Sequence, residues 1–421
     1  MKLKKKISIL LVLIFFINFL ICSNVLATEP NVSAGAIFSA ELSTGKIIYE
    51  KNAHEIKYPA STTKVMTALL VLENCKLTDT ATASYNAISI IPSGYSIANI
   101  QVGETLTIEN LLYALMVCSA NEAANVLAEH VAGSISSFST MMNTRAEELG
   151  CKNTHFVNPN GIHNEDHYST AYDLYLIAKE AMKNETFRKI VSTTTYTLPA
   201  TEKYSEKDRV CKSTNQLLHV NKSSRADNYY YKDCIGIKTG FTTQAQNCLI
   251  SAASRNGLEF INVVLDAGAT ENDLSIRYLD SIELFEFAYE NYAKTTLKNE
   301  NDIIKTIEVK NGTKDTKNLD LLSKDAITVF HNIDIDLKTI EPEIVLKDDF
   351  KAPVKKDAII GTATYKIDDL EYTTELVAGS NVEKSNSFSI FLIVLGLSIL
   401  MFAIIIMPKK NNKRRKIKKR K

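Results

Sequence analysis

The sequence lacks an excess of charge of either sign. It holds 49 Lys and Arg against 48 Asp and Glu, which gives a formal net charge of +1. Proteins that bind nucleic acid usually carry a clear basic excess, so no nucleic-acid partner is expected. The charge is unevenly placed, because ten of the fourteen residues 408–421 are Lys or Arg. The rest of the chain is therefore acidic.

The sequence also lacks any Cys-x-x-Cys pair among its seven cysteines. Their irregular spacing supports neither a zinc site nor a redox motif. Six cysteines lie beyond residue 27, and an exported chain can form disulfides. Cys118 lies at the end of an apolar helical run and is interpreted as a packing residue.

A third absence is the His-Glu-x-x-His motif of zinc peptidases. His163 and His167 flank an acidic stretch, but the spacing differs, and a loop cannot hold the pair as a helix would. A solvated loop is the preferred interpretation, and no metal or cofactor is expected. Asp173, on the helix predicted next, is interpreted as a structural cap or buried partner.

Long hydrophobic runs occur near both ends. The first, residues 7–21, follows four lysines and precedes small residues at a plausible cleavage site, which predicts a secretory signal over residues 1–27. An uncleaved membrane anchor is the alternative. Lipid attachment at Cys22 is disfavoured because the bulky Ile21 precedes it.

The second run, residues 387–407, is uncharged and has the length of a bilayer-spanning helix. A buried helix is disfavoured because the run has no polar face. The basic tail at 408–421 predicts a cytoplasmic C-terminus. The sequence thus predicts a protein of the cell membrane, anchored by this helix, with its main domain on the extracytoplasmic side.

Two domains are predicted between these runs. Residues 33–293 mix strands with amphipathic helices and belong to the α/β (α+β) class. Residues 300–378 show short alternating apolar runs with weak helical periodicity, which predicts a small all-β domain. Within the first domain, Thr107 and Thr170 are expected to cap helices. The β-branched stretch 190–198 is expected to be a strand.

The first chemical motif is Ser61-x-x-Lys64, at the mouth of a predicted apolar helix. Residues three apart share one helix face, so the two side chains can touch. A serine hydroxyl needs a base within hydrogen-bond reach to become a nucleophile. A lysine amine can serve when burial lowers its pKa. Ser43-x-x-Lys46 shows the same spacing but lies in a hairpin turn, so it is discarded.

Two further elements follow along the chain. Ser119-Ala120-Asn121 ends a predicted helix, and Lys238-Thr239-Gly240 lies on a predicted strand. A glycine on a strand lets a substrate backbone approach closely. The order Ser-x-x-Lys, Ser-x-Asn and Lys-Thr-Gly is the signature of penicillin-recognising serine enzymes.

With these motifs the chain resembles the D-alanyl-D-alanine carboxypeptidases of the S11 peptidase type, the low-molecular-mass penicillin-binding proteins. Other segments look like the family in the right order: residues 91–94, 101–104, 111–115, 158–161 and 167–171. The resemblance implies a β-lactamase/transpeptidase-like fold, with an antiparallel sheet flanked by helices. It also implies peptidoglycan stem peptides as substrates and acylation by β-lactam antibiotics.

The same resemblance implies roles for individual residues. Ser61 would be the acylated nucleophile and Lys64 its base, and Ser119 would relay a proton to the leaving amine. Asn121 would hold the substrate amide. The remaining positions lie on the strand, where Lys238 and Thr239 would bind the terminal carboxylate, Gly240 would admit the substrate, and the N–H groups of Ser61 and Phe241 would form the oxyanion hole.

One position departs from the family. After Ala245 the family has Gly and a large residue, whereas this chain has Gln246-Asn247. This departure puts substrate detail in doubt more than activity. A β-lactamase is one alternative, but no Glu-x-x-Leu-Asn segment lies between the second and third motifs. A non-catalytic wall-binding scaffold is another, and the intact motifs disfavour it.

Overall fold

The computed structural model describes residues 29–205, 209–219, 229–269, 275–385 and 387–406, which form two compact units. The first unit comprises Met1–Ala293 with Asn332–Asp334, and the second comprises Lys294–His331 with Ile335–Lys421. The predicted signal at 1–27 and basic tail at 408–421 lie outside the described residues.

The first unit is built on a five-stranded sheet in the order β2-β1-β9-β8-β7, in which every neighbouring pair is antiparallel. The five strands are β1 (Ala36–Glu41), β2 (Ile47–Lys51), β7 (Cys234–Thr242), β8 (Gln246–Arg255) and β9 (Leu258–Ala267). The order brings the N-terminal hairpin beside the last strands of the unit. Two short ladders complete it: β3 (Thr80–Thr82) with β4 (Thr105–Thr107), and β5 (Thr195–Thr197) with β6 (Val210–Lys212).

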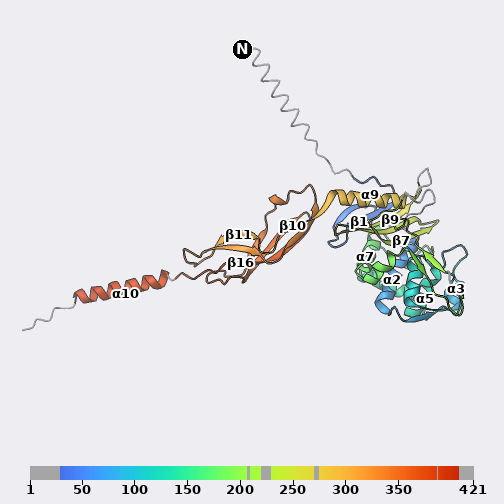
Figure 1. Cartoon of the computed structure of the whole chain (residues 1–421), viewed down its shortest axis with the longest axis horizontal. Helices are drawn as coiled ribbons and strands as arrows, with labels where there is room; N and C mark the ends of the chain where they lie inside the picture. Colours follow the sequence, from blue (N-terminus) through green and yellow to red (C-terminus); the bar gives the residue numbers. More distant parts are fainter. Residues whose placement is uncertain (1–28, 206–208, 220–228, 270–274, 386, 407–421) are drawn as a thin grey trace, which may run out of the picture. The chain divides into compact units, whose positions relative to one another are not determined.

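Alternation along the strands gives the sheet two apolar faces. Ile37 and Val264 pack with Leu284 of α9 (Ile276–Asn291), while the neighbouring Phe38 and Val263 belong to the large core shared with the other helices. Period-two alternation places adjacent side chains on opposite faces. The sheet is therefore buried on both sides, with α9 on one face and the helical lobe on the other (Figure 1).

The helical lobe carries the other helices that the structure describes in this unit. They are the 3₁₀ turn η1 (Ala60–Thr63), α2 (Lys64–Asn74), α3 (Tyr85–Ser89), α4 (Ile108–Met116), α5 (Asn121–Ala132), α6 (Ile135–Glu148), α7 (Ala171–Ala181) and α8 (Glu185–Val191). The predicted caps are confirmed, since Thr107 accepts from Asn110 N and Thr170 from Asp173 N. The starts of these two helices could therefore be predicted from the capping residues in the sequence.

The predicted strand at 190–198 is wrong over its first half. Residues up to Val191 finish α8, and only Thr195–Thr197 form a strand. Asn184 caps α8 through its side chain, and Phe187 and Ile190 bury one face of the helix. Capping and burial therefore outweigh the strand preference of the β-branched residues.

The second unit is all-β in its globular part, as predicted. Its main sheet has the antiparallel order β11-β12-β16-β15-β14, and β10 pairs with β13. Its elements are β10 (Tyr292–Lys298), β11 (Ile303–Glu308), β12 (Asn318–Ser323), β13 (Ile327–Asn332), η3 (Leu337–Thr339), β14 (Glu343–Leu346), β15 (Ile359–Ile367) and β16 (Leu370–Ala378). A separate apolar core around Leu321, Val329 and Leu376 holds it together.

The predicted membrane-spanning helix at 387–407 is a wrong expectation. Ser387–Ile406 do form the helix α10. However, among the residues that the structure describes, no helix has the length and apolar character needed to cross a bilayer.

Candidate active site

Ser61 lies in the 3₁₀ turn η1, directly before α2 begins at Lys64. Ala60, its predecessor, has a φ of +47°, a left-handed conformation that is costly for alanine. Ser61 itself is half-buried, whereas Lys64 is fully buried. The turn thus presents the hydroxyl outward with the amine beneath it.

Three oxygen atoms surround the Lys64 amine. Its Nζ lies 2.8 Å from Ser61 Oγ, 2.8 Å from Asn121 Oδ1 and 2.6 Å from the carbonyl oxygen of Asn160. The last two atoms can only accept hydrogen bonds. A neutral amine has two N–H groups and one lone pair, so donation to both acceptors leaves the lone pair for the Ser61 hydroxyl.

The surroundings of Lys64 favour that neutral form. Burial lowers its pKa well below the usual lysine value, and the positive charge of Lys238 adds to the effect. The carboxylate of Glu122 acts in the opposite direction. Because a buried ammonium loses its hydration, desolvation is the dominant cause. Lys64 is therefore poised to accept a proton.

Ser119 and Asn121 lie where α4 gives way to α5. Ser119 has a φ of +62°, and Asn121 begins α5 after a short non-helical link. Asn121 accepts from Lys64 through Oδ1, while its Nδ2 and backbone N both donate to Ser96 O. The left-handed backbone at Ser119 separates α4 from α5, and Asn121 at the start of α5 contacts Lys64.

The third motif lies on β7, beside η1. A Cβ added at Gly240 would lie 3.0 Å from Pro59 O and 3.1 Å from Ser61 N, so the strand passes close to the nucleophile. Thr239 Oγ1 lies 2.6 Å from Thr214 Oγ1. Lys238 is buried and donates to Thr239 O, and burial lowers its pKa to about 7. Close strand approach explains why a glycine occupies position 240.

These motifs meet in one cleft of about 570 Å³. Six of the eight sequence-predicted residues line it: Ser61, Ser119, Asn121, Thr239, Gly240 and Phe241. The other two, Lys64 and Lys238, are fully buried. Phe241 is 60% exposed at the cleft edge. Segments that are far apart in the sequence thus form one concave site with two lysines below its surface.

Sequence reasoning missed two contributors to this cleft. Arg277, on α9, lines the cleft and donates to Gly240 O. Asn160 supplies the carbonyl that Lys64 contacts, and Gly161 beside it has a φ of +81°. A Cβ at Gly161 would lie 1.9 Å from Ala60 O. Residues 158–161 were recognised as a family segment, but a backbone carbonyl leaves no signature of its own.

The loop around His167 differs from the solvated interpretation. His167 is buried, and its Nδ1 accepts from Val157 N. The other ring nitrogen, Nε2, must then carry the proton and donate to Thr63 Oγ1, 2.8 Å away. Burial lowers the pKa of His167 to about 3, so the ring is neutral. His167 thereby ties its loop to the turn that carries Ser61.

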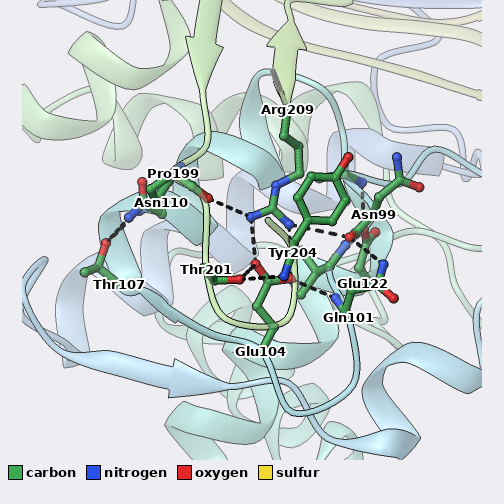
Figure 2. A network of polar contacts seen from close by, with 12 residues as sticks. Asn99, Gln101, Glu104, Thr107, Asn110, Glu122, Pro199, Thr201, Tyr204 and Arg209 are labelled. Carbon is green, nitrogen blue, oxygen red and sulfur yellow. Dashed lines mark hydrogen bonds and ion pairs between the residues drawn. The ribbon is translucent and has the colours of Figure 1, made fainter. Parts of the chain in front are cut away.

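A buried ion pair supports one wall of the cleft. Arg209 donates to both oxygens of Glu104, at 3.0 and 2.7 Å, and Figure 2 shows the two side chains meeting between β6 and the 99–104 segment. Glu122 in the same region accepts from Ala98 N and Ile100 N. These contacts hold the chain that leads from Ser96, whose carbonyl orients Asn121.

The departure at Gln246 also has a structural counterpart. Gln246 has a φ of +56°, a conformation that glycine adopts at little cost. Its side chain donates to Thr243 O at 2.7 Å, and the β7–β8 pairing still closes through Thr242 and Gln246. The β7–β8 hairpin therefore closes with a glutamine in the left-handed conformation at this position.

The sequence of the chain matches two known protein families. Residues 23–269 match Peptidase S11, D-alanyl-D-alanine carboxypeptidase, and residues 292–384 match the penicillin-binding protein 5 C-terminal domain. The D-alanyl-D-alanine carboxypeptidase DacF of Bacillus subtilis is 32% identical over 84% of this chain and 86% of its own length.

Solved structures show the same likeness. The Streptomyces K15 DD-transpeptidase is 36% identical, with a TM-score of 0.55, over 62% of this chain and 99% of its own. The D-alanyl-D-alanine carboxypeptidase DacD of Francisella tularensis shares the fold, at 24% identity and a TM-score of 0.61, over 87% and 98% of the two chains. Since the family match spans more than half of the sequence, the chain belongs to the D-alanyl-D-alanine carboxypeptidases of peptidase family S11.

Proposed function

We propose that this member of the family removes the terminal D-alanine of peptidoglycan stem peptides through an acyl-enzyme on Ser61. One observation carries the assignment. The Lys64 amine faces two oxygens that can only accept, and its third contact is Ser61 Oγ at 2.8 Å. The lone pair of the neutral amine is thereby directed at the hydroxyl proton, as a general base requires.

In the acylation step, Ser61 Oγ attacks the carbonyl carbon of the penultimate D-alanine while Lys64 takes the hydroxyl proton. The developing oxyanion accepts from the backbone N–H groups of Ser61 and Phe241. The proximity of Gly240 to Ser61 N supports this pairing of donors. Collapse breaks the peptide bond, and the proton held by Lys64 passes through the Ser119 hydroxyl to the departing amine. Water then attacks the ester, which releases the shortened peptide and restores Ser61.

Binding of the substrate is assigned to the β7 side of the cleft and to Asn121. The terminal carboxylate lies against Thr239 and Lys238, and Arg277 adds a second cation at the same wall. Asn121 Nδ2 is committed to Ser96 O, so its oxygen is the end that faces Lys64. Thr214, 2.6 Å from Thr239, orients the threonine hydroxyl.

The cellular setting follows from the substrate and from the N-terminal sequence. Family members act on peptidoglycan in the cell envelope, and residues 1–27 have the pattern of a secretory signal. We place the first unit on the extracytoplasmic side of the membrane. β-Lactam antibiotics, which imitate the terminal dipeptide, acylate the same serine.

The test is intact-mass spectrometry of the full chain after exposure to benzylpenicillin. Wild type is expected to gain one penicilloyl group, and Ser61→Ala is expected to gain none. Ser43→Ala is the matched control, because Ser43 belongs to the discarded Ser-x-x-Lys copy and bonds Glu41 instead. It should be acylated like wild type. Release of D-alanine from a stem peptide should follow the same pattern.

Other outcomes would point elsewhere. A folded wild type that gains no adduct and consumes no drug would indicate a scaffold. Rapid turnover of penicillin without D-alanine release would indicate a β-lactamase. Transfer of the acyl group to an added amine, in place of water, would make the chain a transpeptidase, the activity for which the Streptomyces K15 enzyme is named.

A further inference from the structure

Two cysteines lie in contact beside the cleft. Cys118 Sγ and Cys211 Sγ are 2.7 Å apart, although 93 residues separate them in the sequence. Cys118 directly precedes Ser119, and Cys211 lies on β6. Neither takes part in the chemistry proposed above. Such proximity is closer than ordinary contact between sulfur atoms and places the pair within reach of covalent linkage.

Packing holds each sulfur in place. Cys118 follows the end of α4, and its Sγ also lies 3.3 Å from Ala114 O. Cys211 pairs across the ladder with Tyr196, whose ring stacks on Tyr113 of α4 at 3.8 Å between centroids. Tyr196 also donates to Asn110 on the same helix. The β5–β6 ladder is therefore fastened to α4, and the thiols meet because these two elements meet.

The far side of β6 is fastened as well. Arg209, two residues before Cys211, forms the buried ion pair with Glu104 (Figure 2). This pair fixes the strand on the lobe that carries Ser119 and Asn121. The packed elements around the two sulfur atoms thus hold them close together. Two thiols held in this way form a disulfide readily, because little conformational freedom is lost.

The two thiols differ in acidity and in access. The hydrogen bond from Cys118 lowers the pKa of Cys211, and the charge of Arg209 contributes. The same hydrogen bond, with burial, raises the pKa of Cys118. Cys118 is half-buried, whereas Cys211 is only 2% exposed. Because Cys118 is the more exposed of the two, an oxidant in solution reaches the Cys118 sulfur before that of Cys211.

We propose that Cys118 and Cys211 are a redox-active pair, and that a small disulfide oxidises them to a bond joining β6 to the segment that carries Ser119. The balance is that of thiol–disulfide exchange. Transfer of the shared proton from Cys118 to Cys211 leaves the Cys118 sulfur as the thiolate, which attacks the oxidant RSSR, releases RS⁻ and forms a mixed disulfide. Cys211 thiolate then attacks Cys118 sulfur and displaces the second RS⁻. Two thiol protons are lost, and RSSR is reduced to two thiols.

The inference is independent of the proposed function, because it assigns a chemical modification and not a step of peptide hydrolysis. Its structural consequence is a cross-link across the wall that orients Asn121. A cross-link restricts the unfolded chain and stabilises the native state. The oxidised chain should therefore unfold at a higher temperature than the reduced chain.

The first experiment equilibrates the full chain with glutathione disulfide, traps the remaining thiols and maps the peptides without reduction. One linked pair of peptides, containing Cys118 and Cys211, is expected. Wild type incubated in reduced glutathione should show both residues trapped as free thiols. Free or singly modified Cys118 and Cys211 after glutathione disulfide treatment would overturn the proposal.

Two variants make the test sharper. Cys211→Ser should stop at the mixed disulfide and keep one glutathione on Cys118, because the resolving thiol is missing. Cys75→Ser, which removes another half-buried cysteine at the end of α2, should still form the link. Two results would contradict the assignment. One is loss of the Cys118–Cys211 disulfide in Cys75→Ser, and the other is a disulfide between Cys118 and a different cysteine in Cys211→Ser.

Thermal unfolding provides the second readout. Oxidised wild type is expected to unfold several degrees above reduced wild type. Cys211→Ser should show no difference between the two buffers. Equal unfolding temperatures for linked and reduced wild type would show that the bond does not fasten this wall, and would overturn the structural consequence.

Discussion

The two units of the chain bury different kinds of side chain. The first unit buries charged residues, among them Lys64, Lys238 and the pair Glu104–Arg209. In the described part of the second unit, the buried polar residues are Ser323, His331 and Thr374, and its Lys, Asp and Glu are half-buried or exposed. Burial of charge costs free energy unless partners offset it. That cost falls in the unit that carries the catalytic cleft.

The comparison indicates that the first unit gives up some stability in order to hold the buried lysines and strained residues of its active site. Its core would be more stable with apolar residues at the buried lysines, and its left-handed residues Ala60 and Ser119 add strain. The second unit carries a plain apolar core around Leu321 and Val329. Substitutions of buried charged residues should therefore change the stability of the first unit, whereas the charged residues described in the second unit are not buried.

The largest effect is expected from Lys64→Met. Without the amine, nothing beneath Ser61 accepts its proton, and penicillin acylation should slow by about 10³-fold. Lys46→Met is the matched control, since Lys46 belongs to the discarded copy of the motif. It should acylate at the wild-type rate. A wild-type rate in Lys64→Met would remove the base assignment.

The buried ion pair gives the next largest effect. Glu104→Gln leaves Arg209 buried with its charge unpaired, so the free energy of unfolding should fall by about 3–5 kcal/mol. In the second unit, Glu375→Gln breaks the exposed pair with Lys324 and should produce no resolvable change. Urea denaturation measures both. Equal losses would show that burial does not decide the strength of these pairs.

Two tight glycines sharpen the comparison further. Gly161→Ala puts a Cβ against Ala60 O, beside Ser61, and should slow acylation by about 10²-fold through misplacement of the nucleophile. Gly361→Ala, in the second unit, puts a Cβ 2.3 Å from Val345 O. It should destabilise that unit and leave the acylation rate unchanged. A slower rate in Gly361→Ala would show functional coupling between the units.

The buried lysine at 238 predicts a pH dependence of stability. Its pKa in the folded chain, about 7, lies below that of an unfolded lysine. Between these values the unfolded state binds more protons, so the free energy of unfolding rises with pH across this window. Lys238→Met should reduce that slope by up to about 1.4 kcal/mol per pH unit. The exposed Lys366→Met should leave the slope unchanged, and denaturation at several pH values compares them.

The smallest effect concerns the β7–β8 turn. Gln246→Gly removes the cost of a left-handed side-chain-bearing residue and should raise the free energy of unfolding by about 1 kcal/mol. Gln246→Ala keeps that cost and loses the bond to Thr243 O, so it should not stabilise the chain. Stabilisation by both variants would mean that the Gln246 side chain, and not its backbone, strains the turn.

Much of the site could be predicted from the order of short motifs along the sequence. Three short motifs brought Ser61, Asn121 and Thr239 to one cleft because their order along the chain is typical of a known family. What escaped prediction lacks such a pattern. The carbonyl of Asn160 is a backbone atom, and Arg277 reaches the cleft from a helix whose amphipathic pattern gave no reason to single it out.

The errors have physical causes as well. Residues 190–191 have strand-forming side chains, yet packing of α8 decided their conformation. The predicted membrane span rested on the length and apolar character of residues 387–407, and no helix among the described residues is long and apolar enough to cross a membrane. Cys118 packs against the core as expected. Its contact with Cys211 was not anticipated, because the two residues lie 93 positions apart in the sequence.

The orientation of the Asn121 side chain has one further consequence. Its nitrogen is held by Ser96 O and its oxygen by Lys64, so the amide cannot be turned around without losing both bonds. An aspartate at this position would keep the shape and place a negative charge 2.8 Å from the amine. That charge would favour the ammonium form and switch the base off near neutral pH. A neutral amide is therefore the chemical setting that keeps Lys64 basic but unprotonated.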